Sequence, residues 1–146
     1  MIDTFLKKFP GAPTILVVED EGVLREMERG ILEYFGFNVL EADSGRRAYD
    51  LWRNEGEKVD LLLADIILPR GITGVELAKR MVDSQPNLKI IFTTGRILPH
   101  AEQQALAQMN ARFLPKPFEQ EALVQLVRDT LGVTDSGAAS AGLSVA

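Results

Sequence analysis

The chain has 146 residues, 46% of them hydrophobic and 25% charged, with a formal net charge of −5 at pH 7. This is the length and composition of one globular domain, which excludes a disordered chain, a fibrous protein and a large multidomain protein. The absence of cysteine excludes disulfides, iron–sulfur clusters and thiolate zinc sites. Because the surface is acidic and no apolar run approaches the ~20 residues that span a bilayer, we expect a cytoplasmic protein with no nucleic-acid or membrane partner.

Residues 1–13 are predicted to be an N-terminal extension. Apolar residues at helical spacing mark one face of a short helix: Ile2, Phe5, Leu6 and Phe9. Residues 10–13 then interrupt it with proline and glycine. Two interpretations stay open. The segment is either frayed and lies against the domain, or it is a helix that docks on a partner or dimerises. In the case of dimerisation the protein would be a homodimer.

Residues 14–18 are a continuous apolar, β-branched run, typical of a strand covered on both faces. A helix over residues 22–35 follows, and Gly36 ends it. Its apolar residues stand at helical spacing: Val23, Met27, Ile31 and Phe35. Residues 37–41 alternate between apolar and polar side chains, which predicts a short second strand.

Ser44 is placed to cap a helix that runs to about Asn54, with three residues facing inward: Ala48, Leu51 and Trp52. Residues 61–65 form a second apolar run and predict another buried strand. A loop with Pro69, Gly71 and Gly74 precedes a helix over residues 74–84. Its inward residues are Leu77, Ala78, Met81 and Val82.

Residues 88–93 predict a third buried strand. Pro99 suits the first turn of the next helix, whose core residues are Ala101, Ala105, Leu106 and Met109. A short strand over residues 112–115 follows. Glu119 begins the last helix, with Leu123, Leu126, Val127 and Leu131 facing inward.

The predicted strands and helices alternate, which specifies an α/β fold with a parallel sheet, helices on both faces and right-handed crossovers. We place this domain at residues 14–132. Residues 133–146 lack periodicity and are rich in Gly, Ala and Ser, so we expect a disordered tail.

Polar residues follow the strands at their carboxyl ends, where open parallel sheets bind ligands: Glu19, Asp20, Asp65, Thr94 and Lys116. Clustered carboxylates raise one another's pKa unless a cation neutralises them. Hard oxygen ligands without His or Cys select Mg²⁺, Mn²⁺ or Ca²⁺ rather than zinc. Each residue alone reads as a turn former, a helix cap or a surface lysine; together they predict a metal-assisted phosphoryl site with one carboxylate as candidate nucleophile.

Five stretches in this order resemble the response-regulator receiver domain of two-component signalling. They are residues 15–21 (ILVVEDE), residues 60–69 (DLLLADIILP), Gly71 with Gly74, Thr94-Gly95, and residues 113–118 (FLPKPF). The resemblance covers about residues 14–132. It implies a flavodoxin-like, doubly wound sheet of five parallel strands in the order 2-1-3-4-5.

The resemblance also implies a role for each residue of the site. Asp65 would accept a phosphoryl group from a histidine kinase or phosphotransfer protein. Asp20 would bind Mg²⁺ (or Mn²⁺) directly with Glu19 beside it, and Asp65 and the backbone carbonyl of Ile67 would supply further ligands.

Thr94 would contact the phosphoryl group, Lys116 would pair with it, and the Lys116–Pro117 bond would be cis. Movement of Thr94 would let Phe113 rotate and reshape the face of the fourth helix, fifth strand and fifth helix, where a downstream protein would bind.

Some residues depart from the usual family pattern. Leu68 replaces a common methionine, a substitution of similar volume. Phe113 lacks the hydroxyl of a tyrosine often found there, so a hydrogen-bonded switch state is lost. Ile67 and Arg96 occupy positions where families tune dephosphorylation, and apolar Ile67 would impede an attacking water. His100, the only histidine, is expected to be an exposed residue of a helix.

Other functions remain as alternatives. A metal-dependent phosphatase would need Asp-x-Asp after the first strand, where this chain has Asp20-Glu21-Gly22. A pseudo-receiver that is never phosphorylated would not need the intact set of Asp20, Asp65, Thr94 and Lys116. A nucleotide-binding domain would need a glycine-rich phosphate loop, which is absent from this sequence. The starting Met and the extension favour a stand-alone regulator over the receiver piece of a hybrid histidine kinase.

Overall fold

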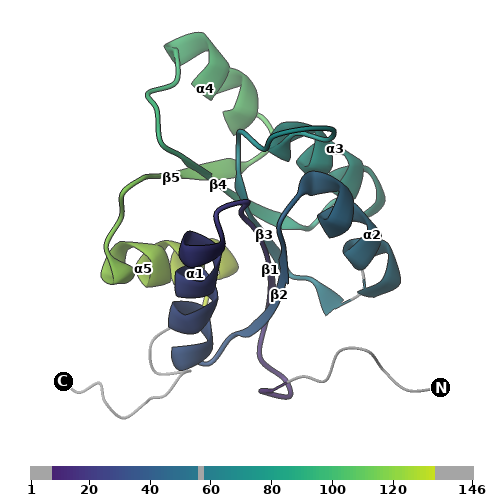
Figure 1. Cartoon of the computed structure of the whole chain (residues 1–146), viewed down its shortest axis with the longest axis vertical. Helices are drawn as coiled ribbons and strands as arrows, with labels where there is room; N and C mark the ends of the chain where they lie inside the picture. Colours follow the sequence, from purple (N-terminus) through teal and green to yellow (C-terminus); the bar gives the residue numbers. More distant parts are fainter. Residues whose placement is uncertain (1–7, 56–57, 134–146) are drawn as a thin grey trace.

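The computed structural model describes residues 8–55 and 58–133 (Figure 1). The predicted helix residues Ile2, Phe5 and Leu6 and the predicted tail from residue 134 onward lie outside the described residues. Val133, which we assigned to the tail, still donates a backbone hydrogen bond to the Arg128 carbonyl, 3.1 Å away.

Within these residues, strands and helices alternate along the whole domain. The strands are β1 (Thr14–Val18), β2 (Asn38–Ala42), β3 (Leu61–Asp65), β4 (Lys89–Thr94) and β5 (Ala111–Pro115). The helices are α1 (Gly22–Tyr34), α2 (Gly45–Glu55), α3 (Gly74–Ser84), α4 (His100–Ala107) and α5 (Gln120–Leu131). All strand pairs are parallel and the order is β2-β1-β3-β4-β5, which confirms the predicted topology.

Each strand supplies side chains to two apolar layers, because successive side chains of a strand point to opposite faces. One layer joins α1 and α5 to the sheet through Ile15, Val17, Leu32, Leu61, Leu63, Ile91, Leu123 and Val127. The other joins α2 and α3 to the opposite face through Leu16, Val18, Leu62, Ala64, Trp52, Leu77, Met81 and Phe92. Figure 1 shows these helix pairs on the two sides of the sheet. The central residues of β1, β3 and β4 are therefore apolar because both faces of these strands are covered, and the polar residues stand at the strand ends.

Two helices bury residues other than those the spacing indicates. In α1, Val23 and Met27 are 86% and 42% exposed, and the fully buried positions are Glu28 and Leu32. In α4, Ala101 and Ala105 are exposed and only Leu106 is buried, while Met109 lies beyond the helix end. Pro99 precedes α4 as its N-cap residue instead of occupying its first turn. Figure 1 shows why: α4 projects beyond the sheet, so little of its surface can be buried.

Candidate functional site

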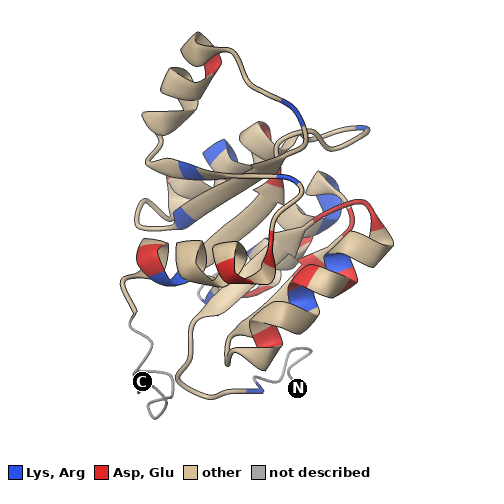
Figure 2. Cartoon of the chain, turned by 90° about the vertical axis from the view of Figure 1, so that its left-hand side faces the viewer, with Lys and Arg blue, Asp and Glu red and all other residues tan. Residues whose placement is uncertain are grey.

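The parallel register places the ends of four strands at one edge of the sheet. Asp65 is opposite Thr93 across the β3–β4 pair, and Thr94 is opposite Pro115 across the β4–β5 pair. The backbone N–H of Lys116 donates to the Thr94 carbonyl at 2.8 Å, so Lys116 emerges beside the end of β4. Figure 2 shows acidic residues in the loop that leads from β1 into α1 at this edge. The predicted site residues that follow these strands are thus brought to a common edge.

Lys116 lies between two carboxylates, one just after β1 and one at the end of β3. Its Nζ is 2.7 Å from Asp65 Oδ2 and 3.0 Å from Glu19 Oε1. The Glu19 side chain is 1% exposed and that of Asp65 is 12% exposed. Ion pairs in such a setting are poorly screened by solvent, and the Lys116 ammonium contacts both of these carboxylates.

The pKa values of this cluster follow from burial and pairing. Burial raises the pKa of the Glu19 carboxyl above its usual value, against the opposing effects of the Glu21 N–H and Lys116. Burial acts to lower the pKa of Lys116, but the hydrogen bonds and charges of Asp65 and Glu19 outweigh it, so this pKa is raised. Lys116 therefore stays positively charged in the site at neutral pH.

Three carboxylates converge as a metal site requires. Oxygen atoms of Glu19, Asp20 and Asp65 all lie within 4.8 Å of one another. Glu19 and Asp65 are buried and Asp20 is exposed, so the cluster opens to solvent on one side. An all-oxygen, carboxylate set that leaves room for water and phosphate oxygens suits Mg²⁺ or Mn²⁺, so the residues fit the predicted cation.

The phosphoacceptor candidate Asp65 is held by the backbone that follows it. Its Oδ1 accepts a hydrogen bond from the Ile67 N–H at 3.0 Å, while Oδ2 faces Lys116. Gly74 begins α3 directly against this turn, where a Cβ atom would stand 2.1 Å from the Asp65 carbonyl oxygen. Only glycine permits this approach, which explains in physical terms why Gly74 belongs to the motif. The Ile67 side chain is 51% exposed beside the site.

The predicted switch residues lie on β4 and β5. The buried Thr94 hydroxyl donates to the Arg96 carbonyl and accepts from the Arg96 N–H, both at 3.2 Å. Phe113 is half-buried, with its ring centroid 6.2 Å from that of Phe92. The Lys116–Pro117 peptide is cis, as the resemblance implies.

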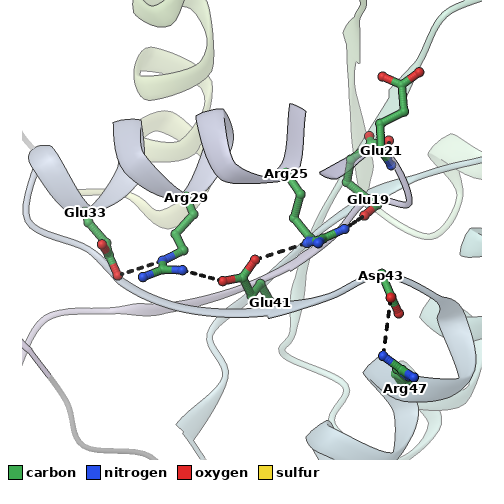
Figure 3. Close-up of polar contacts among 8 residues, drawn as sticks. All are labelled: Glu19, Glu21, Arg25, Arg29, Glu33, Glu41, Asp43 and Arg47. Carbon is green, nitrogen blue, oxygen red and sulfur yellow. Dashed lines mark hydrogen bonds and ion pairs between the residues drawn. The ribbon is translucent and has the colours of Figure 1, made fainter. Parts of the chain in front are cut away.

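Two notable residues of α1 were not predicted from the sequence. Arg25 donates from Nη1 to the backbone carbonyl of Glu19 at 2.8 Å (Figure 3). Glu28 is 1% exposed and its Oε2 has no hydrogen-bond partner among the described residues. The only signal for Glu28 was its place four residues before Leu32 on the same helix face, and charged residues are ordinarily assigned to the solvent side.

Comparison with known proteins identifies the family and the fold of this chain. The response regulator receiver domain model matches residues 15–128. Response regulator receiver protein CpdR of Brucella abortus is 36% identical over 80% of this chain and 95% of CpdR. Sensor kinase CckA of the same organism is 31% identical over 86% of this chain, which spans only 13% of the kinase.

Solved structures show the same fold. The chemotaxis protein CheY4 of Vibrio cholerae superposes with a TM-score of 0.73 and 26% sequence identity, over 83% of this chain and 100% of CheY4. Among the described residues, no helix has the length and apolarity to cross a membrane. From the family match, the identity to CpdR and the shared fold, the chain belongs to the response regulator receiver domain family.

Proposed function

We propose that this chain is a phosphoacceptor receiver of a two-component phosphorelay in the cytoplasm, in which Asp65 takes a phosphoryl group from a sensor histidine kinase or a phosphotransfer protein. The observation that carries the proposal is the position of Lys116, 2.7 Å from Asp65 and 3.0 Å from Glu19 beside a third carboxylate. An aspartate that only ends a strand does not need a buried lysine and two further carboxylates beside it. A phosphoryl acceptor needs a nearby cation, because its own carboxylate and the oxygens of the incoming phosphoryl group are all negatively charged.

The protein ligands of the cation would be the carboxylates of Glu19, Asp20 and Asp65 and the backbone carbonyl of Ile67. When bound, Mg²⁺ or Mn²⁺ offsets the charge of the phosphoryl oxygens and helps to align the reacting groups. Asp20 is the exposed member of the cluster, so it lies on the side from which a donor would approach.

In the transfer, a carboxylate oxygen of Asp65 forms a bond to phosphorus as the phosphorus–nitrogen bond of the donor phosphohistidine breaks. The imidazole leaves with the electron pair of that bond. Lys116 already contacts Asp65 Oδ2, so its ammonium is within reach of the oxygens of the new acyl phosphate. The hydrogen bond from the Ile67 N–H fixes the orientation of the carboxylate before the reaction.

The signal would leave the site through Thr94. Its hydroxyl is committed to Arg96 here, and a phosphoryl oxygen on Asp65 would compete for that donor. We infer that Thr94 turns toward the phosphoryl group, that Phe113 rotates into the space released, and that the face of α4, β5 and α5 changes for a downstream protein.

The match over 95% of CpdR supports a single-domain response regulator with residues 14–132 as its receiver domain. The match to a segment of the sensor kinase CckA supports the alternative, the receiver piece of a hybrid histidine kinase. The phosphorylation chemistry of Asp65 is the same in either context.

The test is intact-mass measurement after incubation with acetyl phosphate and Mg²⁺. We expect one added phosphoryl group on the unmodified protein, and none on Asp65→Asn, on Asp65→Ala or in EDTA. Asp50→Asn, which changes an exposed aspartate of α2, serves as the matched control and is expected to label normally. Labelling of the Asp65 variants at the parent level would refute the assignment of Asp65, and an unlabelled parent protein would favour a pseudo-receiver.

A further inference from the structure

In the acidic turn between β1 and α1, three polar groups of Glu19 make hydrogen bonds and the fourth, Oε1, makes an ion pair. Its N–H donates to the Ala42 carbonyl at 3.2 Å, and its Oε2 accepts from the Glu21 N–H at 3.1 Å. Its Oε1 faces Lys116, and its backbone carbonyl accepts from Arg25 Nη1 at 2.8 Å. Arg25 is not itself a proposed metal ligand, but its side chain donates a hydrogen bond to the backbone of one.

Arg25 is itself anchored on β2. Its Nε lies 3.1 Å from Glu41 Oε1, and the other oxygen of Glu41 accepts from Arg29 Nη1 at 2.6 Å. Arg29 in turn pairs with Glu33 at 3.4 Å. The side chains of Arg25 and Glu41 are only 21% and 29% exposed, so this pair is better protected from solvent than an ordinary surface ion pair. Figure 3 shows the chain of contacts that ends at Glu19.

We propose that Arg25 is a positioning residue that holds the Glu19–Asp20 turn in the conformation that binds the divalent cation. The inference rests on the proposed function, because it assigns Arg25 a part in building the site that Glu19, Asp20 and Asp65 form. The planar guanidinium suits this task, since its fork of N–H donors reaches a carbonyl and a carboxylate at once. Residues that orient ligands are as much a part of a metal site as the ligands themselves.

The charge of Arg25 would act in the opposite direction to its hydrogen bonds. A guanidinium beside the turn repels a divalent cation, so a purely electrostatic role predicts tighter Mg²⁺ binding when Arg25 is removed. A positioning role predicts weaker binding. Arg29 provides a matched control, because it is also an arginine of α1 and pairs with the same Glu41, yet no hydrogen bond joins it to Glu19 among the contacts of the described residues.

The experiment is calorimetric titration of Mg²⁺ into the full chain and into Arg25→Ala, Arg25→Lys and Arg29→Ala. We expect Arg25→Ala to weaken binding by roughly 10-fold or more, and Arg29→Ala to bind within about twofold of the parent. Arg25→Lys keeps the charge without the fork geometry, so it should also bind more weakly than the parent. In acetyl phosphate labelling, the same variants should need more Mg²⁺ for half-maximal rate, with a smaller effect on the rate at saturating Mg²⁺.

Parent-level or tighter Mg²⁺ binding by both Arg25 variants would overturn the positioning role while leaving the proposed function in place. Equally weakened Mg²⁺ binding by Arg29→Ala would also overturn the positioning role, because the effect would then come from the loss of a positive charge on α1. A parent chain that binds no Mg²⁺ would refute the cation site itself, and with it the role of Arg25. Arg25→Lys keeps the test decisive if Arg25→Ala does not fold.

Discussion

Glu28 is a buried carboxyl of α1, within electrostatic reach of the site residues Glu19, Asp65 and Lys116. It is 1% exposed, and burial raises its pKa from about 4.5 to about 8, with a smaller contribution from repulsion by Glu19. The folded protein therefore holds the Glu28 proton at a pH where the unfolded chain releases it. Since the folded state binds more protons, stability must fall as pH rises between these two values.

We predict that replacing Glu28 by Gln removes this pH dependence. Between pH 5 and pH 8, in EDTA, the free energy of unfolding of the parent should fall more steeply than that of Glu28→Gln, with a difference of up to about 3 kcal/mol at pH 7. Urea unfolding at several pH values measures it. Glu26→Gln, at an exposed position of the same helix, is the control. The raised pKa of Glu19 acts in the same direction but is present in both proteins, so parallel curves would show that Glu28 is ionised in the fold.

Gly74 tests how tightly α3 is packed against the phosphoacceptor turn. Gly74→Ala would bring a Cβ atom within 2.1 Å of the Asp65 carbonyl oxygen, which is backbone and cannot turn away. We expect a loss of roughly 1–3 kcal/mol in the free energy of unfolding. Gly30→Ala, in α1 with nothing within 4 Å of its Cβ position, should instead stabilise the protein by about 0.5–1 kcal/mol. Equal effects of Gly74→Ala and Gly30→Ala on the unfolding midpoint would show that α3 does not pack closely against the turn after Asp65.

At the scale of elements, α4 is the least secured helix of the described fold. It buries Leu106 alone, and its N-cap residue Pro99 makes no side-chain cap hydrogen bond. By contrast, α3 buries four residues and begins with a reciprocal capping box between Thr73 and Glu76. Few buried contacts and poor capping lower the free energy of local opening.

We therefore predict that the amides of α4 exchange with solvent faster than those of α3. Hydrogen exchange followed by mass spectrometry of peptides covering residues 100–107 and 74–84 would measure the difference. Leu106→Ala should accelerate exchange in α4 with little effect on α3. Equal protection of the two helices in the parent protein would contradict this account of their packing.

The strands were predictable from sequence and the helix faces less so. The β1 and β3 bounds agree with prediction, because a strand buried on both faces has a continuous apolar run. On α1 the apolar residues Val23 and Met27 face solvent and Glu28 is buried. The sequence could not predict this, because the side of a helix that packs on the sheet is determined by the tertiary fold and not by residue type alone. In α4 the projection of the helix beyond the sheet, a tertiary property, leaves Ala101 and Ala105 exposed.

The site was predictable as a set of strand-end residues but not as a set of contacts. Strand order and parallel direction bring Glu19, Asp65 and Lys116 to one edge, which topology alone implies. The contact of Arg25 with the Glu19 carbonyl was not predictable, because it depends on a side-chain conformation and a backbone acceptor. The roles assigned to Thr94 and Phe113 remain predictions.

At the scale of the whole molecule, the parallel sheet concentrates negative charge at the edge where the site lies, and Lys116 compensates it within the site. Phosphorylation would add charge at this point, with Mg²⁺ and Lys116 to balance it. Helix α4, which buries only Leu106, follows β4 and precedes β5, and both strands end at the site. The proposed function therefore depends on one covalent event at Asp65.

Trapping the acyl phosphate tests that event directly. Borohydride reduces an aspartyl phosphate to homoserine, which peptide mass spectrometry places at a single position. After incubation with acetyl phosphate and Mg²⁺, we expect homoserine at position 65 and at no other aspartate. Homoserine at position 20 or elsewhere, or phosphorylated protein that borohydride leaves unchanged, would contradict it.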